Sequence, residues 1–150
     1  MEIMRDERVG AYALSGGILL LLVKFSALGA LTNHSFGLLL APTLGRWAIA
    51  IAVTTFPYAR SQGLGRDIKD HSSWRQALMA TLVAFAVVAL LTWYSQSWMA
   101  PIAFVAAAIA TWGISRFVLH RLPGLTGDIY GAMNEVVEVV VLLVLVAAYH

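Results

Sequence analysis

Three carboxylates lie at or inside a segment that is apolar enough to cross a bilayer. Asp128 stands at the start of the apolar stretch 129–149, and Glu135 and Glu138 lie within it. An ionised carboxylate at membrane depth costs several kcal/mol unless it is paired with a cation or hydrogen-bonded. Each acid inside this segment therefore needs a partner or a chemical role.

The spacing of these acids predicts one polar stripe on a helix that begins at about Asp128. Seven residues separate Asp128 from Glu135, which places them within about 20° of one another around the helix axis. Glu138 follows one turn later on nearly the same side. Gly131 lies on this stripe and would let a cation or a phosphate–metal complex approach the backbone.

A glycine-rich turn, Gly-Leu-Thr-Gly, precedes this helix. It offers backbone N–H groups and the Thr126 hydroxyl at a helix N-terminus, where the helix dipole favours an anion. We therefore expect Thr126, Gly127 and Gly131 to contact substrate. In a purely structural interpretation, Thr126 or Asp128 caps the helix, and the two glutamates pair with Lys24 and Arg46.

A second motif, PYARSQGLGRD, starts at Pro57, which should end or kink the preceding helix. Gly63 and Gly65 allow close backbone approach to a ligand, and Arg60 and Arg66 supply cations, so the motif could hold a phosphate. The same pattern also describes an ordinary tight loop lying on anionic lipid headgroups.

A third motif, EIMRDERVGAY, carries Glu2, Arg5, Asp6, Glu7 and Arg8 immediately before the first apolar stretch. Mixed charge at a helix start is often only a solvated surface. We expect this motif and the other two motifs to lie at one and the same membrane surface.

Oxygen ligands beside clustered arginines favour a hard cation such as Mg²⁺ that holds a phosphorylated substrate. The chain has no cysteine, and its four histidines are scattered at loops and ends, so a site built from soft ligands is not expected. The residues therefore suggest phosphoryl or nucleotidyl transfer.

The elements that must position these motifs follow from composition, because 60% of the residues are hydrophobic and only 12% are charged. We predict an all-α, polytopic integral membrane protein, with 1–150 forming a single transmembrane domain. Helices of about 20 apolar residues span a bilayer, and five such stretches occur, at about 10–31, 37–59, 76–95, 97–119 and 129–149. The first is longer than the apolar core of a signal peptide and is expected to be retained.

Lysine and arginine are concentrated in alternate connections. They occupy the N-terminal segment, the 60–75 loop and the 116–128 connection, whereas the two other turns have none. The positive-inside rule then places the N-terminus in the cytoplasm and the C-terminus outside. Trp74, Trp93 and Trp98 fall near predicted span ends, where tryptophan is typical of the headgroup level.

The motifs EIMRDERVGAYA, YARSQGLG and GLTGDIYGAMNEVVEVVVLL, with Lys24 and Arg46 between them, resemble the cobalamin synthase family in order and approximate spacing. The family is also called adenosylcobinamide-GDP ribazoletransferase. The resemblance implies an integral membrane enzyme, and we expect it in the cell inner membrane with its active face cytoplasmic. It also implies Mg²⁺-dependent transfer of cobinamide phosphate from adenosylcobinamide-GDP to α-ribazole or its 5′-phosphate, with release of GMP.

The residues and the resemblance together assign roles. The expected catalytic residues are Asp6, Arg8 and Asp128; the expected metal ligands are Asp6, Asp128 and Glu135; and the expected substrate-binding residues are Arg5, Arg60, Gly63, Gly65, Thr126, Gly127 and Gly131. The arginines would neutralise the GDP diphosphate. Glu138 is the acid most readily assigned to structural pairing.

Two departures from the family stand out. Glu7 occupies a position where the family usually has serine. The chain also resembles only the C-terminal three-fifths of a synthase, and lacks the aspartate-rich motif of the N-terminal part. We therefore expect a truncated or divergent form, and whether it is active alone stays open.

Alternative functions are a helical transport or structural membrane protein, or an inactive synthase fragment. Buried charges also line ion pathways. We expect membrane lipid as a partner and no nucleic acid, and a homo-oligomer or a separate N-terminal segment is left open.

Overall fold

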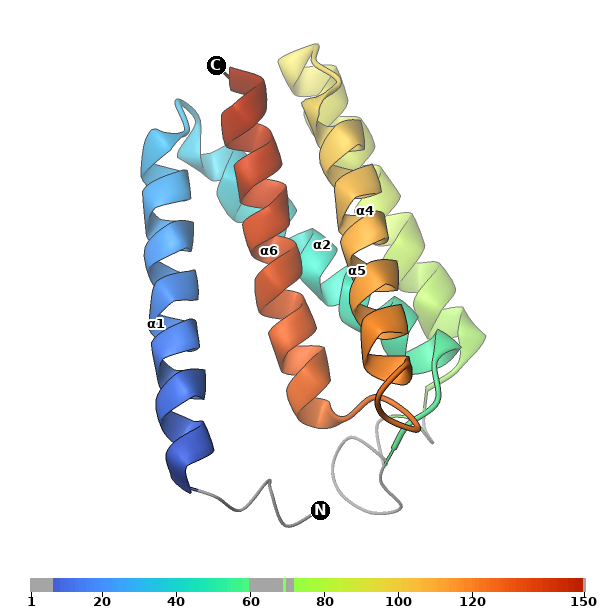
Figure 1. Ribbon diagram of the computed structural model, residues 1–150. Helices are drawn as coiled ribbons and strands as arrows, with labels where there is room; N and C mark the ends of the chain where they lie inside the picture. Colours follow the sequence, from blue (N-terminus) through green and yellow to red (C-terminus); the bar gives the residue numbers. More distant parts are fainter. Residues whose placement is uncertain (1–6, 60–68, 70–71, 150) are drawn as a thin grey trace.

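The computed structural model describes residues 7–59, 69 and 72–149, and within them the protein is all-helical. The helices are α1 (Glu7–Ala30), α2 (His34–Thr55), α4 (Trp74–Ser95), α5 (Met99–Leu119) and α6 (Gly127–Tyr149), shown in Figure 1. All five are long and apolar enough to cross a membrane. The predicted fold class is confirmed, and the chain is a multi-pass membrane protein.

The helix bounds follow local chemistry. Asn33 precedes α2, and its side-chain oxygen accepts a hydrogen bond from the Phe36 backbone N–H at 3.3 Å, which caps the helix. At the other end, α2 stops at Thr55, four residues before the end of the expected apolar stretch. Phe56 is extended (φ −105°, ψ 153°) because it precedes Pro57, whose ring disfavours helical backbone there. Pro57 therefore ends α2, as predicted.

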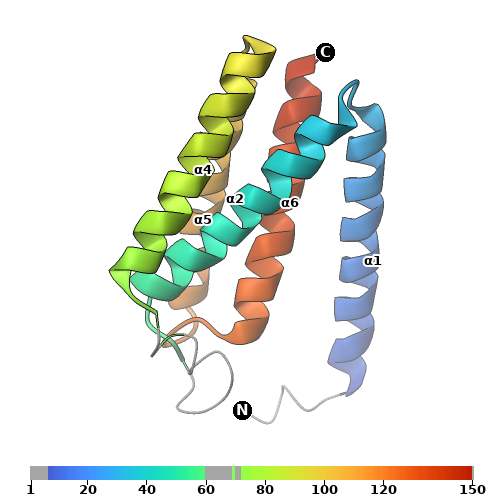
Figure 2. The ribbon, with the colours of Figure 1, turned by 180° about the vertical axis from the view of Figure 1, so that it is seen from behind.

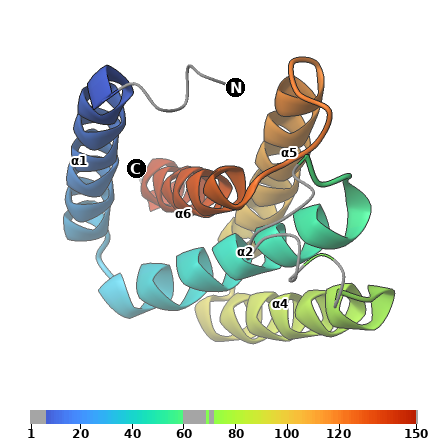
Figure 3. The same cartoon turned by 90° about the horizontal axis from the view of Figure 1, so that it is seen from below.

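Helix α6 lies in the middle of the bundle and contacts α1, α2 and α5. Figure 1 shows α2 crossing the bundle diagonally behind α6; from the opposite side, in Figure 2, α2 passes in front of α6, and α4 lies on the side of α2 away from α6. The view along the bundle in Figure 3 shows α1 at the edge, next to α6 and one end of α2. The central position of α6 brings its polar stripe within reach of neighbouring helices.

The core lies where α2 and α5 pack against α6. Leu40 and Leu44 of α2 and Met133, Val137 and Val141 of α6 are fully buried. Small residues on α2 and α5, among them Ala48, Ala52, Ala103 and Ala107, are also fully buried and let the helices approach closely.

The outward faces carry large exposed apolar side chains, which suit contact with lipid hydrocarbon. Trp74 begins α4, and Trp93 and Trp98 flank the α4–α5 turn; all three are exposed. Their positions at helix ends match the predicted headgroup anchors.

Candidate functional site

The start of α1, the end of α2 and the start of α6 all lie at one end of the bundle (Figure 1). This end is where the three sequence motifs were expected to meet. Arg5, Asp6, Arg60, Gly63 and Gly65 lie outside the described residues, and Arg8 belongs to α1 without a described side chain. Their predicted roles stay predictions.

Two of the motifs are joined through their backbones at a place that we call the junction, formed by Pro57–Ala59 and Gly124–Thr126. The Ala59 N–H donates to the Leu125 carbonyl, and the Leu125 N–H donates to the Pro57 carbonyl, both at 2.8 Å. These bonds form a short parallel bridge between Tyr58 and Leu125. The junction therefore ties the end of α2 to the start of α6.

Gly124 makes this close approach possible. A Cβ at this position would lie 2.6 Å from the Ala59 nitrogen and 2.6 Å from the Tyr58 carbonyl carbon. Both are backbone atoms, which cannot move aside without breaking the junction. The glycine is therefore required by backbone contact.

Two tyrosines extend the junction. The rings of Tyr58 and Tyr130 stack with centroids 6.2 Å apart. The Tyr130 hydroxyl is buried and has no hydrogen-bond partner within the part of the chain that the structure describes. A buried hydroxyl without a partner is energetically unfavourable.

Lys69 stabilises the same end of the bundle. Its Nζ donates to the carbonyls of Val53 at 2.5 Å, Phe56 at 2.9 Å and Thr54 at 3.3 Å. These carbonyls belong to the last turn of α2 and the residue after it, where a cation is favoured. From the sequence, Lys69 was expected only to be one of the cations of the 60–75 loop, and its contact with α2 was not predicted.

Asp128 lies in the first turn of α6 and is exposed, as is Gly131 one turn later. A Cβ on Gly127 or on Gly131 would meet no atom within 4 Å. Thr126, which directly precedes the helix, is buried. The start of α6 therefore presents a carboxylate on an open helix face, as the predicted stripe requires.

Deeper along α6, both glutamates are paired with Lys24 of α1. The Lys24 Nζ donates to Glu135 Oε2 at 2.5 Å and to Glu138 Oε2 at 2.7 Å. The side chains of Lys24 and Glu138 are only 14% and 13% exposed, whereas that of Glu135 is 42% exposed. Glu138 is therefore the more completely enclosed of the two acids.

Arg46 of α2 completes this network. Its Nη1 donates to Glu138 Oε1 at 3.1 Å and to Asn134 Oδ1. The Asn134 amide in turn donates to Glu138 Oε1 at 2.8 Å and to Glu135 Oε1 at 3.1 Å. We call Lys24, Arg46, Asn134, Glu135 and Glu138 the buried network, in which two cations balance two anions.

The predicted pairing of the two glutamates with Lys24 and Arg46 is confirmed. Arg46, however, was expected in the interior, and its side chain is 66% exposed. Asn134 was missed, although an amide one turn before Glu138 in an apolar segment is a detectable signal.

Among the described residues, no group of three or more histidines, aspartates or glutamates could hold a metal ion. Glu135 is held by Lys24, so its predicted part in metal binding is not tested by this arrangement. Asp128 lies apart from the buried network. It is the exposed acid of the predicted stripe, and it lies at the end of the bundle where α6 begins.

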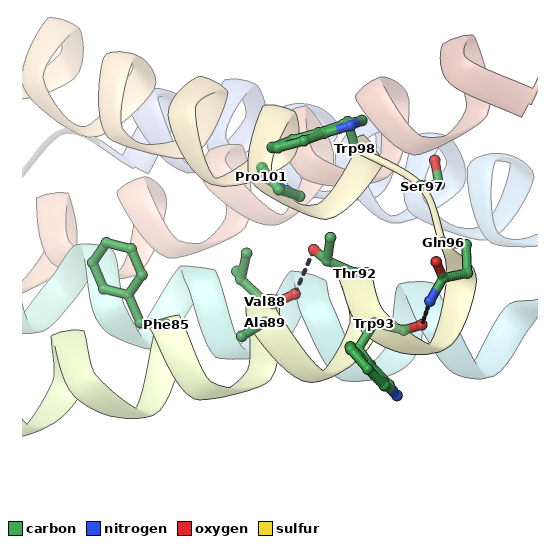
Figure 4. A pocket seen from close by; sticks show the side chains of 9 residues that line it. All are labelled: Phe85, Val88, Ala89, Thr92, Trp93, Gln96, Ser97, Trp98 and Pro101. Carbon is green, nitrogen blue, oxygen red and sulfur yellow. Dashed lines mark hydrogen bonds between the residues drawn. The ribbon is translucent and has the colours of Figure 1, made fainter.

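A separate cavity of about 470 Å³ lies at the opposite end, against the α4–α5 turn (Figure 4). Its lining is mostly apolar. The Thr92 hydroxyl donates to the Val88 carbonyl at 2.7 Å, and the Gln96 amide donates to the Trp93 carbonyl at 2.5 Å. No lining residue is charged, so this cavity supplies neither a carboxylate for a metal ion nor a cation for a phosphate.

Comparison with known proteins gives a match over most of the chain. The family described as cobalamin-5-phosphate synthase matches residues 1–146. An adenosylcobinamide-GDP ribazoletransferase of Pseudomonas syringae pv. tomato is 37% identical over 150 residues, which are 97% of this chain and 59% of the relative. The protein of the same name from Desulfitobacterium hafniense is 37% identical over 148 residues, 95% of this chain and 58% of the relative.

The chain thus spans about three-fifths of the length of the curated relatives that it matches. A third relative with this name, from Brevibacillus brevis, is 35% identical and gives the same proportion, with 99% of this chain aligned to 60% of the relative. No solved structure matches.

Proposed function

The chain belongs to the cobalamin-5-phosphate synthase family, and on that basis we propose that it takes part in joining adenosylcobinamide-GDP to α-ribazole or α-ribazole 5′-phosphate. The products are adenosylcobalamin or its phosphate, and GMP. The observation that carries this proposal is the family match over residues 1–146, which includes all three sequence motifs.

The geometry at the start of α6 supports a site for a phosphorylated substrate. Helix N-terminal N–H groups and the helix dipole favour phosphate oxygens at Thr126 and Gly127. The junction holds this helix start against the end of α2, after which the chain continues towards Arg60. A guanidinium there would neutralise the diphosphate.

The described residues are compatible with Mg²⁺, because this ion commonly takes one or two protein carboxylates and completes its shell with phosphates and water. Asp128 supplies one exposed carboxylate, and Asp6 is a second candidate. When bound, Mg²⁺ would neutralise charge on the diphosphate. Glu135 is a weaker candidate because Lys24 already holds it at 2.5 Å.

In the reaction, a hydroxyl oxygen of α-ribazole forms a bond to the phosphorus that carries cobinamide. The bond from that phosphorus to the GMP oxygen breaks, GMP leaves with the bonding electron pair, and the hydroxyl proton is lost. The protein contributes mainly by positioning the reactants and stabilising the charge that develops on GMP.

We also propose that the end bearing Asp128 faces the cytoplasm and that the protein resides in the cell inner membrane. The excess of lysine and arginine in the segments at this end supports that orientation. Cytoplasmic nucleotide substrates would then reach the site directly.

The test is conversion of adenosylcobinamide-GDP and α-ribazole by membranes containing this chain, with and without Mg²⁺. A second arm co-expresses the two-fifths of the Pseudomonas syringae relative that this chain does not match. Adenosylcobalamin and GMP should form in at least one arm, and their formation should require Mg²⁺. Failure of both arms, with the chain folded in the membrane, contradicts the proposal.

Asp128→Asn tests the site within the active arm. Loss of one group that stabilises transition-state charge typically lowers kcat by about 100-fold or more. Ser97→Ala, in the α4–α5 turn at the opposite end, is the control and should leave the rate unchanged. Full activity and unchanged Mg²⁺ dependence in Asp128→Asn would show that this carboxylate is not part of the site.

A further inference from the structure

Arg46 occupies an unusual position on the surface of the bundle, between two cavities where α2 meets α4. One cavity has a volume of about 470 Å³ and an otherwise mostly apolar lining that includes Trp47, Met79 and Val83. The other has a volume of about 210 Å³ and includes Thr54 and Gln76. Arg46 lines both, so its side chain lies between the two cavities.

The Arg46 guanidinium retains unused hydrogen-bond donors. A guanidinium has five N–H donors, and only Nη1 bonds to the buried network. The Nε and Nη2 groups donate to no residue within the described ranges. Since the side chain is 66% exposed, these donors are accessible from outside the bundle.

The depth of Arg46 can be judged from α4. Trp74, the first residue of α4, is 69% exposed and lies where tryptophan marks the headgroup level. Gln76 and Ala80, which line the cavities beside Arg46, follow two and six residues later. At a rise of about 1.5 Å per residue, these positions lie within about 10 Å of the helix start. A long arginine side chain can reach the headgroup region from this depth.

The two cavities together match the two chemical parts of a phospholipid. The smaller cavity has room for about seven water molecules, at about 30 Å³ each, and therefore for a small headgroup. The Gln76 amide oxygen accepts from the Ser73 N–H at 3.2 Å. Its NH₂ group donates to no described residue, which leaves further donors beside the guanidinium.

The cavity at the α4–α5 turn provides an internal comparison. It has the same volume, about 470 Å³, as the apolar groove beside Arg46. No charged residue lines it, and its Thr92 and Gln96 side chains donate to backbone carbonyls. An acyl chain could lie in either groove, but only the groove at Arg46 has a cation that selects a phosphate.

We propose that the α2–α4 groove at Arg46 binds an anionic phospholipid from the leaflet at which α6 begins. The phosphate accepts from the Nε and Nη2 groups of Arg46, and one acyl chain lies in the groove between α2 and α4. A guanidinium suits a phosphate because it can donate two parallel hydrogen bonds.

The test is lipid retention by the purified whole chain, measured by native mass spectrometry after titration with defined lipids. Phosphatidylglycerol, phosphatidylcholine and a diacylglycerol with the same acyl chains are compared. One phosphatidylglycerol should be retained most strongly, and diacylglycerol least. Millimolar inorganic phosphate should not displace it, because free phosphate lacks the acyl chain.

Two variants address the site directly. Arg46→Gln should raise the Kd for phosphatidylglycerol at least tenfold, because it removes two charge-assisted hydrogen bonds. Ala50→Leu fills the smaller cavity while keeping every residue of the buried network, and it should also weaken retention. It keeps the test decisive if Arg46→Gln does not fold.

Arg116→Gln is the matched control, because it removes an exposed arginine at the same end of the bundle that lines neither cavity. It should leave lipid retention unchanged. Equal retention of phosphatidylglycerol and diacylglycerol by the parent chain, or unchanged retention in Ala50→Leu, would overturn the proposal.

Discussion

The buried network and the start of α6 use acidic residues of one helix in opposite ways. Glu135 and Glu138 bond to Lys24 of α1, Glu138 also bonds to Arg46 of α2, and these ion pairs connect α1, α2 and α6. Asp128 lies seven residues before Glu135, at the open end of the same helix, and is exposed. The acids at membrane depth therefore hold helices together, whereas Asp128 lies on an exposed face at the start of α6.

If this contrast is correct, Glu138→Gln should have the largest effect on stability. The substitution removes the anion that contacts both Lys24 and Arg46 in a mostly enclosed site. Breaking such a buried pair is strongly destabilising, and we expect the free energy of unfolding in mixed micelles to fall by about 2–3 kcal/mol.

Glu135→Gln is the matched control for that measurement. Its side chain is more exposed, and Lys24 would keep Glu138 as a partner, so the loss should be clearly smaller. Equal stability of Glu138→Gln and the parent chain would contradict a structural role for the network.

Gly124→Ala should have an intermediate effect and act on the junction. Its Cβ would meet the backbone of Tyr58 and Ala59 at 2.6 Å, so the two segments must separate. We expect a loss of about 1–2 kcal/mol, as for other overpacked sites, measured by thermal unfolding in detergent. Transferase activity should fall as well, because the junction positions the start of α6.

Gly113→Ala tests whether this effect is local. A Cβ on Gly113, within α5, would meet no atom within 4 Å. Alanine is also the better helix former, so stability should be unchanged or slightly higher. A similar loss in both glycine variants would argue against the junction as the cause.

Asp128→Asn should have the smallest effect on stability. A surface carboxylate in the first turn of a helix contributes typically less than about 1 kcal/mol through the helix dipole. The contrast with the buried network therefore predicts a nearly unchanged unfolding midpoint together with the large loss of activity described above. If Asp128→Asn lowered the free energy of unfolding as much as Glu138→Gln does, Asp128 would have a structural role like that of the two glutamates.

Several features follow from the sequence alone because they depend on neighbouring residues. Apolar stretches of sufficient length predict five transmembrane helices, and Pro57 predicts the end of α2. The helical period places Asp128, Gly131, Glu135 and Glu138 on one stripe. The need to pair charge inside a membrane predicts that Lys24 and Arg46 meet the glutamates.

Only the tertiary structure decides which partners meet and how closely. Lys24 and Glu135 are 111 residues apart in sequence, and no local pattern states that Lys24 bonds to both glutamates while Arg46 remains two-thirds exposed. The bridge between Tyr58 and Leu125, and the need for glycine at position 124, likewise arise from the packing of distant segments. The sequence therefore determines which polar groups need partners, and the packing of α1, α2 and α6 determines which groups pair with one another.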